Sequence, residues 1–206
     1  MNKRRWSAGL GATAVAIAIA SGRGRGRTLD RQLFHVLNRD RGPFADALFK
    51  GVTELGSIWA SVGAALSLSR TGRRREAFDA LGAAAAMWSL GQILKRVVRR
   101  PRPYRSLASY RLLIDQPSGT SFPSSHPAVL LAFLIVASRN VGVPAQVRAA
   151  LGGLTGVVGV SRVYVGVHYP ADVVGGLLLG WATAELWSSV VSPAVLGGTV
   201  LPTGAG

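Results

Sequence analysis

The chain has 206 residues, which is enough for one domain of ordinary size. Hydrophobic residues make up 49% of it and charged residues only 16%, against roughly 25% in an average globular protein, so the composition favours a membrane protein. The net charge of +15 comes without any nucleic-acid-binding motif, and the absence of cysteine excludes disulfides and thiolate metal sites.

The first apolar segment covers residues 6–21 and follows a basic start. A signal peptide has the same layout, with a basic region, a short apolar run and small residues near its end. The arginines at positions 23, 25 and 27 favour a retained span instead. We therefore expect residues 1–27 to form a basic segment and a first span, with a cleaved signal peptide as the alternative.

Residues 28–49 mix leucines with aspartates and arginines, which predicts an amphipathic helix at the membrane interface or, alternatively, an ordinary linker helix. Further apolar segments cover residues 51–69, 77–94, 128–138, 145–164 and 171–191. Their many glycines and alanines suit helices that pack closely in lipid. The sequence thus predicts an all-α, polytopic transmembrane bundle of five or six spans with an interfacial N-terminal helix. Residues 192–206 contain glycine and proline and are expected to form a flexible tail.

A first cluster of candidate functional residues lies where segment 77–94 ends, in a long connection rich in Arg, Pro and Ser. Long connections in compact domains usually carry function. Arginine matches phosphate oxygens with a planar fork and lysine supplies a compact charge, so Lys95 and Arg102 are predicted to bind phosphate. For Arg96, Arg99 and Arg100, side chains that reach lipid headgroups are an equally good interpretation.

A second cluster, Ser124, Ser125 and His126, precedes Pro127 and an apolar run. Proline suits the first turn of a helix, so these residues should surround a helix start, whose free N–H groups attract anions. The alternative is plain serine capping with a solvated His126.

A third cluster contains Arg162, His168 and Asp172, with Pro170 between the last two. Pro170 can open a helix that places Asp172 in its first turn. Asp172 could then fold back and accept a hydrogen bond from one ring nitrogen of His168, which leaves the other nitrogen free as a nucleophile. The alternatives are that Asp172 is only a helix-start acid and that Arg162 only reaches towards headgroups. If the spans alternate in direction, all three clusters emerge on one membrane face and can form one site.

These motifs resemble the signature of the type 2 phosphatidic acid phosphatase (PAP2) superfamily. That signature is Lys, six residues and Arg-Pro, then Pro-Ser-Gly-His, then Ser-Arg, five residues, His, three residues and Asp. The chain has Lys95 to Arg102-Pro103, Pro123 to His126, and Ser161-Arg162 to His168 and Asp172. Ser125 stands where the family often has glycine. The resemblance implies a membrane phosphatase domain over residues 28–191.

The resemblance also implies a mechanism. His168 would attack phosphorus to give a phosphohistidine, Asp172 would orient it, and His126 would protonate the leaving oxygen and later activate water. The phosphate would be bound by Lys95, Arg102, Ser124, Ser125 and Arg162, and no metal or other cofactor would be needed. The partners would be a lipid phosphate substrate and anionic headgroups, in a multi-pass protein of the cell membrane with an extracytoplasmic active site.

Two other functions stay open from the sequence. The superfamily resembles vanadium haloperoxidases, although their size and solubility disagree with the apolar spans here, and a lipid-binding membrane protein without turnover is also possible. Among substrates we favour a polyprenyl-linked lipid of the decaprenylphosphoryl phosphoribose type. Undecaprenyl diphosphate, phosphatidylglycerophosphate and phosphatidic acid are the alternatives, and the sequence does not determine the oligomeric state.

Overall fold

A computed structural model describes residues 3–197, and this part of the chain is helical with no β-strand, which confirms the all-α prediction. The helices follow one another along the chain as α1 (Lys3–Ser21), α2 (Gly24–Leu37), α3 (Pro43–Glu54), α4 (Ile58–Arg70), α5 (Arg74–Val98), α6 (Pro103–Ser106), α7 (Ser125–Val141), α8 (Ala145–Tyr164), α9 (Pro170–Val190) and α10 (Ser192–Val195).

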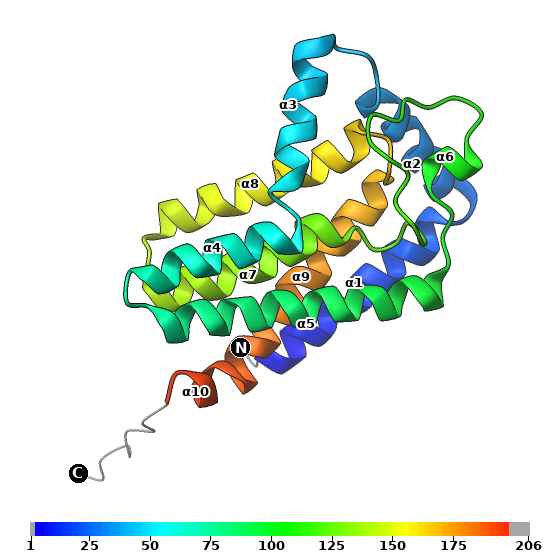
Figure 1. Cartoon of the computed structure of the whole chain (residues 1–206). Coiled ribbons are helices and arrows are strands. Elements are labelled where there is room, and N and C mark those ends of the chain that lie inside the picture. The colour runs from blue at the N-terminus through cyan, green and yellow to red at the C-terminus, as the bar shows by residue number, and fades with distance from the viewer. Residues whose placement is uncertain (1–2, 198–206) are drawn as a thin grey trace.

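Six of the helices form a bundle, and the others lie at its ends (Figure 1). Helix α9 packs against α1 and α7, α7 also packs against α5 and α8, and α4 lies on α5. Helices α2 and α6 and the long connection before α7 gather at one end, from which α3 projects. We call this the near end. Each of the six bundle helices, α1, α4, α5, α7, α8 and α9, has one terminus there, so the near end can collect side chains from all of them.

Local sequence signals set where the helices begin and end. Ser57 caps α4 by accepting a hydrogen bond from the Ala60 N–H at 3.1 Å. Pro170 occupies the first turn of α9, as expected. Helix α7 stops at Gly142, whose φ of 75° is a left-handed conformation that glycine adopts without strain. These residues turn the chain back at each end of the bundle.

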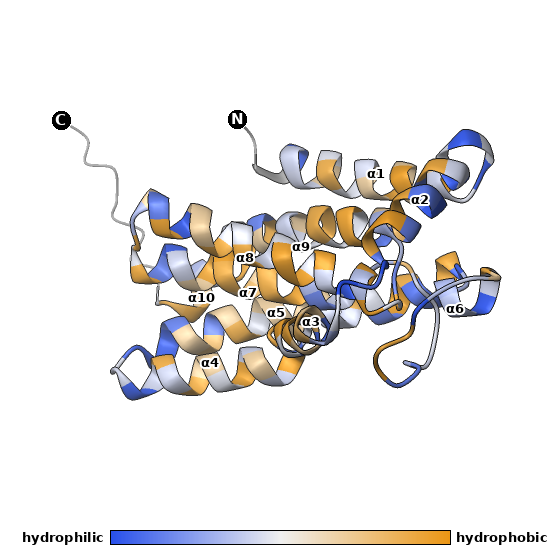
Figure 2. Ribbon diagram, turned by 90° about the horizontal axis from the view of Figure 1, so that it is seen from above, coloured by the Kyte–Doolittle hydropathy of each residue, from blue (hydrophilic) through white to orange (hydrophobic). Residues whose placement is uncertain are grey.

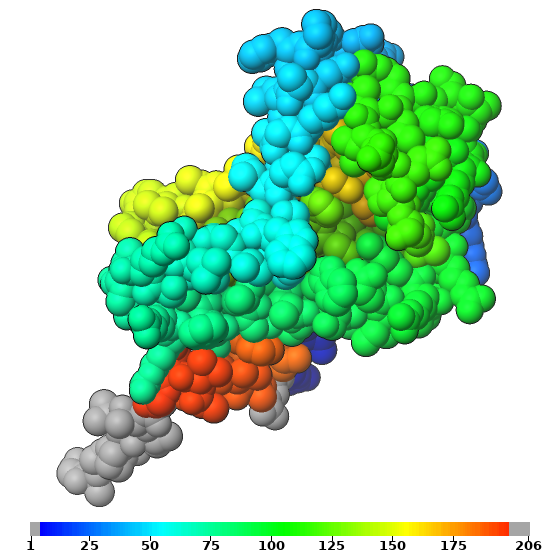
Figure 3. All heavy atoms as spheres, viewed as in Figure 1, coloured from blue at the N-terminus to red at the C-terminus, as the bar shows by residue number. Residues whose placement is uncertain are grey.

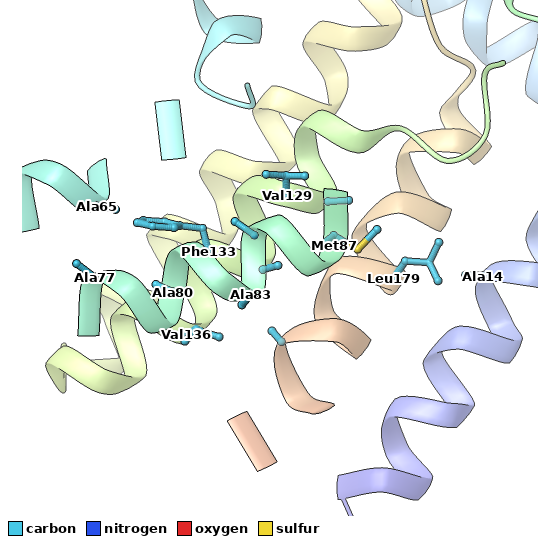
Figure 4. Packing of buried hydrophobic residues seen from close by; sticks show 14 of the residues in the cluster. Ala14, Ala65, Ala77, Ala80, Ala83, Met87, Val129, Phe133, Val136 and Leu179 are labelled. Carbon is cyan, nitrogen blue, oxygen red and sulfur yellow. The ribbon is translucent and has the colours of Figure 1, made fainter. Parts of the chain in front are cut away.

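The core of the bundle is built from small residues on α5, α7 and α9, together with Met87 and Phe133 (Figure 4). A Cβ atom added at Gly180 of α9 would lie 2.5 Å from the Ala128 carbonyl oxygen of α7. The backbones therefore approach more closely than any larger residue would allow, in agreement with the close packing that the composition predicts.

Apolar residues cover the middle of the bundle, and polar residues gather at the connections between helices (Figure 2). Two segments of the described chain are long and apolar enough to cross a membrane, Arg74–Ser106 with α5 and Pro170–Val190 with α9. Helix α7 is apolar but shorter, at 17 residues. These helices indicate a membrane protein.

The structure corrects two predicted boundaries. Residues 28–49 are not one helix, because the chain turns between α2 and α3. The side chain of Asn38 holds this turn by donating to the Tyr164 carbonyl at 2.7 Å and to the Arg111 carbonyl at 2.9 Å. The long connection expected after segment 77–94 begins later, because α5 continues to Val98, and it contains the short helix α6.

The first residues of the predicted tail form a short helix, α10. Ser192 opens α10, is buried, and donates from its hydroxyl to the Asp79 carboxylate at 2.6 Å. The described chain is thus held to α5 at this point, and the expectation of flexibility is wrong for residues 192–195. The rest of that prediction, for residues 198–206, lies outside the described residues.

Candidate active site

A cavity of about 400 Å³ opens at the near end, between the turn that joins α3 to α4, helix α5 and the connection before α7. Figure 3 shows the hollow beside the cyan start of α4, with atoms of later helices at its bottom. Most of the predicted site residues line it, namely Lys95, Arg102, Ser125, His126, Arg162 and His168. Residues from all three clusters therefore meet in one place. Ser124 and Asp172 are buried behind the cavity wall.

His168 lies in the connection between α8 and α9 and is only 2% exposed. Its Nε2 atom lies 3.2 Å from Arg102 Nη1. Burial, together with the positive charges of Arg102, Arg162 and Lys95, holds the pKa of His168 well below its usual value. The imidazole is thus neutral at neutral pH, and a neutral imidazole keeps a lone pair on one nitrogen, as a nucleophile requires.

Asp172 lies in the first turn of α9, as predicted, but its hydrogen bonds differ from the prediction. The Oδ2 atom is 3.6 Å from His168 Nδ1, which is too long for a hydrogen bond. Its donors are instead Ser121 Oγ at 2.5 Å, the Tyr169 N–H at 2.8 Å and Arg100 Nη1 at 2.7 Å. These three donors hold the carboxylate beside His168 without a direct bond between the two side chains.

The arginines of the cavity are fixed by neutral oxygen atoms. Arg102 donates to the carbonyls of Val167, Gly119 and Ser118 at 3.0 to 3.3 Å. Arg162 donates from Nη1 to the Thr53 hydroxyl at 2.7 Å. Within residues 3–197 neither arginine forms an ion pair, nor does Lys95, so their positive charges can act on an anion in the cavity.

The start of α7 presents two serines whose hydroxyls have no hydrogen-bond partner in the described chain, although both are buried. Ser124 is the N-cap residue, but its side chain makes no capping hydrogen bond, so plain capping does not explain it. Ser125 lines the cavity at the positive end of the helix. Buried hydroxyls without partners are uncommon, and that of Ser125 lies where an anion would bind.

Several residues that contact the site are not among the site residues predicted from the sequence. Arg100, for which the sequence favours a headgroup contact as much as a phosphate contact, is 11% exposed and ion-paired with Asp172, which rules the headgroup interpretation out. Arg96 and Arg99 are exposed, so for them it stays open. Ser121, Thr53 and Asp30 contact site residues from distant segments, and no local spacing pattern marks them.

No group of three or more His, Asp or Glu side chains that could hold a metal ion occurs among residues 3–197. His168 and His126 line the cavity beside cations, an arrangement that suits a phosphate dianion better than a divalent metal.

Comparison with known families agrees with this geometry. The model of the PAP2 superfamily matches residues 76–195. The chain belongs to the PAP2 superfamily. The match includes every predicted site residue from Lys95 to Asp172, whereas Asp30 and Thr53 lie outside it.

Three PAP2-type proteins are similar over much of the chain. Decaprenylphosphoryl-5-phosphoribose phosphatase of Mycobacterium tuberculosis is 35% identical over 126 residues, 61% of this chain and 66% of the relative. Undecaprenyl-diphosphatase of Sulfolobus acidocaldarius is 28% identical over 155 residues, 72% of each. The chain also resembles the crystal structure of a transmembrane PAP2 type phosphatidylglycerolphosphate phosphatase from Bacillus subtilis, with a TM-score of 0.75, 21% identity, and coverage of 89% of this chain and 94% of that one. The matched segment thus spans slightly less than two thirds of the mycobacterial relative.

Proposed function

We propose that the protein is an integral-membrane lipid phosphatase that uses His168 as its nucleophile and needs no metal. The observation that supports this most is the position of His168, a buried neutral imidazole whose Nε2 atom lies against Arg102 in a cavity with two further cations, Lys95 and Arg162. A nucleophile among fixed positive charges is what phosphoryl transfer requires, because charge develops on the phosphoryl oxygens.

The proposed reaction has two steps. In the first, the bound phosphate dianion favours the protonated form of His126, His168 Nε2 attacks phosphorus, the bond from phosphorus to the leaving oxygen breaks, and the His126 imidazolium gives that oxygen a proton and becomes neutral. In the second, His126 takes a proton from water, the water oxygen attacks phosphorus, and the N–P bond breaks to release phosphate and restore His168. The negative charge of Asp172 balances the positive charge that the imidazole gains.

The cations and the start of α7 stabilise the transferring group. We propose that Lys95, Arg102 and Arg162 bind the phosphoryl oxygens and that Ser125 donates to them, with Ser124 supporting the helix start. The two arginines are already held by Thr53 and by backbone carbonyls, so little reorganisation accompanies the reaction.

The substrate that we favour is a polyprenyl-linked lipid phosphate of the decaprenylphosphoryl phosphoribose type. The mycobacterial relative, at 35% identity, is named for that lipid. The cavity wall carries the exposed apolar side chains of Trp59 and Trp88, which suit a hydrocarbon chain beside the phosphate. Undecaprenyl diphosphate, phosphatidylglycerophosphate and phosphatidic acid are the alternative substrates.

We further propose that α1, α4, α5, α7, α8 and α9 all cross the membrane of the cell. Each has one terminus at the near end, which makes six crossings and puts the active site on a single face. That face is extracytoplasmic in our proposal. Residues 28–191 would form the phosphatase domain, and residues 1–27 would form the basic segment and first span.

The deciding experiment measures phosphate release from a panel of the four lipid phosphates by the purified protein in detergent with EDTA. The wild type should release phosphate, and His168→Ala should lose at least about a thousandfold in kcat. His35→Ala changes an exposed histidine on α2 and serves as the matched control, with expected wild-type activity. Phosphate on His168 should be trapped by a rapid quench. Equal release by His168→Ala and wild type would contradict the role of His168 as nucleophile, and no release by the wild type from any of the four lipids would contradict the phosphatase function.

A further inference from the structure

Arg100 joins two carboxylates from distant parts of the chain. Its Nη1 atom donates to Asp172 Oδ1 at 2.7 Å, and its Nη2 atom pairs with Asp30 Oδ2. The guanidinium also lies over the Tyr169 ring, 4.4 Å from the ring centroid. A planar fork can bind two carboxylates only in a defined orientation, so these partners fix Arg100 in one position.

Asp30 lies on α2 and is only 5% exposed. Its second oxygen, Oδ1, accepts a hydrogen bond from the Ala171 N–H at 2.8 Å. Ala171 belongs to the first turn of α9, where N–H groups have no partner within the helix. One carboxylate thus holds both Arg100 and the helix start that carries Asp172. Asp30 does not line the catalytic cavity, so it can affect the reaction only through these neighbours.

The charges of this group matter as much as its contacts. If Arg100 had only Asp172 as a partner, the positive charge of Arg100 would cancel the negative charge of the Asp172 carboxylate. With Asp30 present and both carboxylates ionised in their contacts with Arg100, the three side chains carry one net negative charge. That charge lies next to His168, whose Nδ1 atom is 3.6 Å from Asp172 Oδ2 and has no hydrogen-bond partner in the described chain.

On the basis of the proposed phosphatase function, we propose that Asp30 is a positioning residue that acts through Arg100. It fixes the Asp172 carboxylate and leaves its negative charge available to His168 when the phosphohistidine forms. Asp30 lies outside residues 76–195, which match the family model, and no motif of the sequence marks it. Because Asp30 touches none of the phosphate-binding cations, the proposal predicts an effect on turnover and none on substrate binding.

Asp30→Asn is the direct test, because asparagine keeps an oxygen for the Ala171 N–H, removes the negative charge, and turns an amide NH2 towards Arg100 in place of the accepting oxygen. We expect kcat to fall about tenfold or more, since hydrogen bonds to charged groups are worth that much, while KM stays within about twofold. In an Asp172→Asn background, Asp30→Asn should lower kcat by no more than about twofold further, because the carboxylate on which Asp30 acts is gone.

Glu185→Gln is the matched control. Glu185 is also a buried carboxylate that pairs with an arginine, Arg139, but it lies at the other end of α9. The control should keep the wild-type kcat, and any general loss of stability from breaking an ion pair should appear in both variants. Arg100→Lys is the second variant, to be used if Asp30→Asn does not fold. Lysine keeps the positive charge of Arg100 and loses the planar guanidinium that binds two carboxylates. Arg100→Lys should therefore lower kcat in the wild-type background and have no additional effect on kcat in the Asp172→Asn background.

The outcomes separate this proposal from the phosphatase function itself. If His168→Ala loses phosphate release and Asp30→Asn keeps the wild-type kcat, the positioning role of Asp30 is overturned and the phosphatase function stands. The same holds if the effects of Asp30→Asn and Asp172→Asn multiply. If the wild type releases no phosphate from any of the four lipids, both proposals fall together.

Discussion

Two buried carboxylates lie at opposite ends of the helical bundle, and their surroundings differ. At the far end, Asp79 accepts hydrogen bonds from Trp187 Nε1, Asn140 Nδ2 and Ser192 Oγ at 2.6 to 2.8 Å. All three donors are neutral, and they connect α5 to α7, α9 and α10. At the near end, Asp172 is held by Ser121, Tyr169 and a charged partner, Arg100, beside a cavity.

The polar atoms around each carboxylate show what the difference means. Among the described residues, four of the six buried side-chain atoms without a hydrogen-bond partner belong to predicted site residues at the near end, namely Ser124 Oγ, Ser125 Oγ, Arg162 Nε and His168 Nδ1, and the other two are Ser61 Oγ on α4 and Ser188 Oγ on α9. None of the donors to Asp79 is among them. A fully satisfied polar network holds helices together, whereas buried polar groups left without partners need a ligand or a reaction to explain them. We therefore expect the far end to control stability and the near end to control activity.

The largest expected effect comes from changing the two carboxylates in the same way. Asp172→Asn should lower kcat about a thousandfold, because His168 loses the negative charge that stabilises it during transfer. Asp79→Asn should leave kcat within about twofold and lower the free energy of unfolding by about 1–3 kcal/mol, because an amide NH2 then faces a donor. Phosphate release and thermal unfolding of both variants measure this. A large loss of kcat in Asp79→Asn would contradict the expectation that the far end controls stability and not activity.

A steric change near His126 should have the next largest effect. A Cβ atom at Gly56 would lie 2.7 Å from His126 Cβ and 2.7 Å from Val158 Cγ1. Gly56→Ala should therefore displace the proposed acid and lower kcat between about tenfold and a hundredfold. Gly63→Ala on α4 is the control, because nothing lies within 4 Å of its added Cβ atom, and it should keep the wild-type kcat. Equal activity of the two variants would contradict the role of His126.

A smaller effect is expected from Thr53, which holds Arg162 from outside the family match. Thr53→Val removes the oxygen that accepts from Arg162 Nη1, and it should lower kcat/KM by about threefold to tenfold. Thr155→Val is the control, because Thr155 is equally buried but donates only to a carbonyl of its own helix, Gly152. If Thr155→Val loses as much kcat/KM as Thr53→Val, the contact with Arg162 is not the cause.

The smallest expected effect is a dependence of stability on pH. The pKa of His168 is lowered by burial and by nearby cations, so below the ordinary histidine pKa of about 6.5 the unfolded chain binds more protons at this residue than the folded chain does. The free energy of unfolding should then fall as the pH drops through this range. His168→Asn should show a smaller drop in thermal midpoint than the wild type between pH 7.5 and 5.5. An unchanged drop in His168→Asn would show that another group causes the pH dependence.

The sequence predicts those parts of the structure that depend on short spacing. Lys95 lies in the last turn of α5 and Arg102 in the connection that follows, and His168 and Asp172 lie on either side of the start of α9, so local geometry brings each pair together. The break near residue 40 was also predictable, because Gly42 followed by Pro43 is a turn signal. The prediction of a single helix over residues 28–49 gave this turn signal too little weight.

Other contacts could not be predicted because they join segments that no local period relates. Thr53 and Arg162 are 109 residues apart, and Asp30 and Arg100 are 70 apart. Whether such side chains meet depends on how the helices pack, and one sequence does not specify that packing. The missing hydrogen bond between Asp172 and His168 has the same origin, because Arg100 and Ser121 are among the donors that hold the carboxylate and both come from the connection before α7.

The contact between Asp30 and Arg100 also has a consequence for inheritance. The two residues lie on either side of the boundary at residue 76, where the family match begins. A chimera that joined the first 75 residues of one relative to the remainder of another could leave a guanidinium facing the wrong partner. Natural recombination at that boundary meets the same obstacle. The two segments should therefore descend together, and a substitution at position 30 should be followed in later generations by one at position 100.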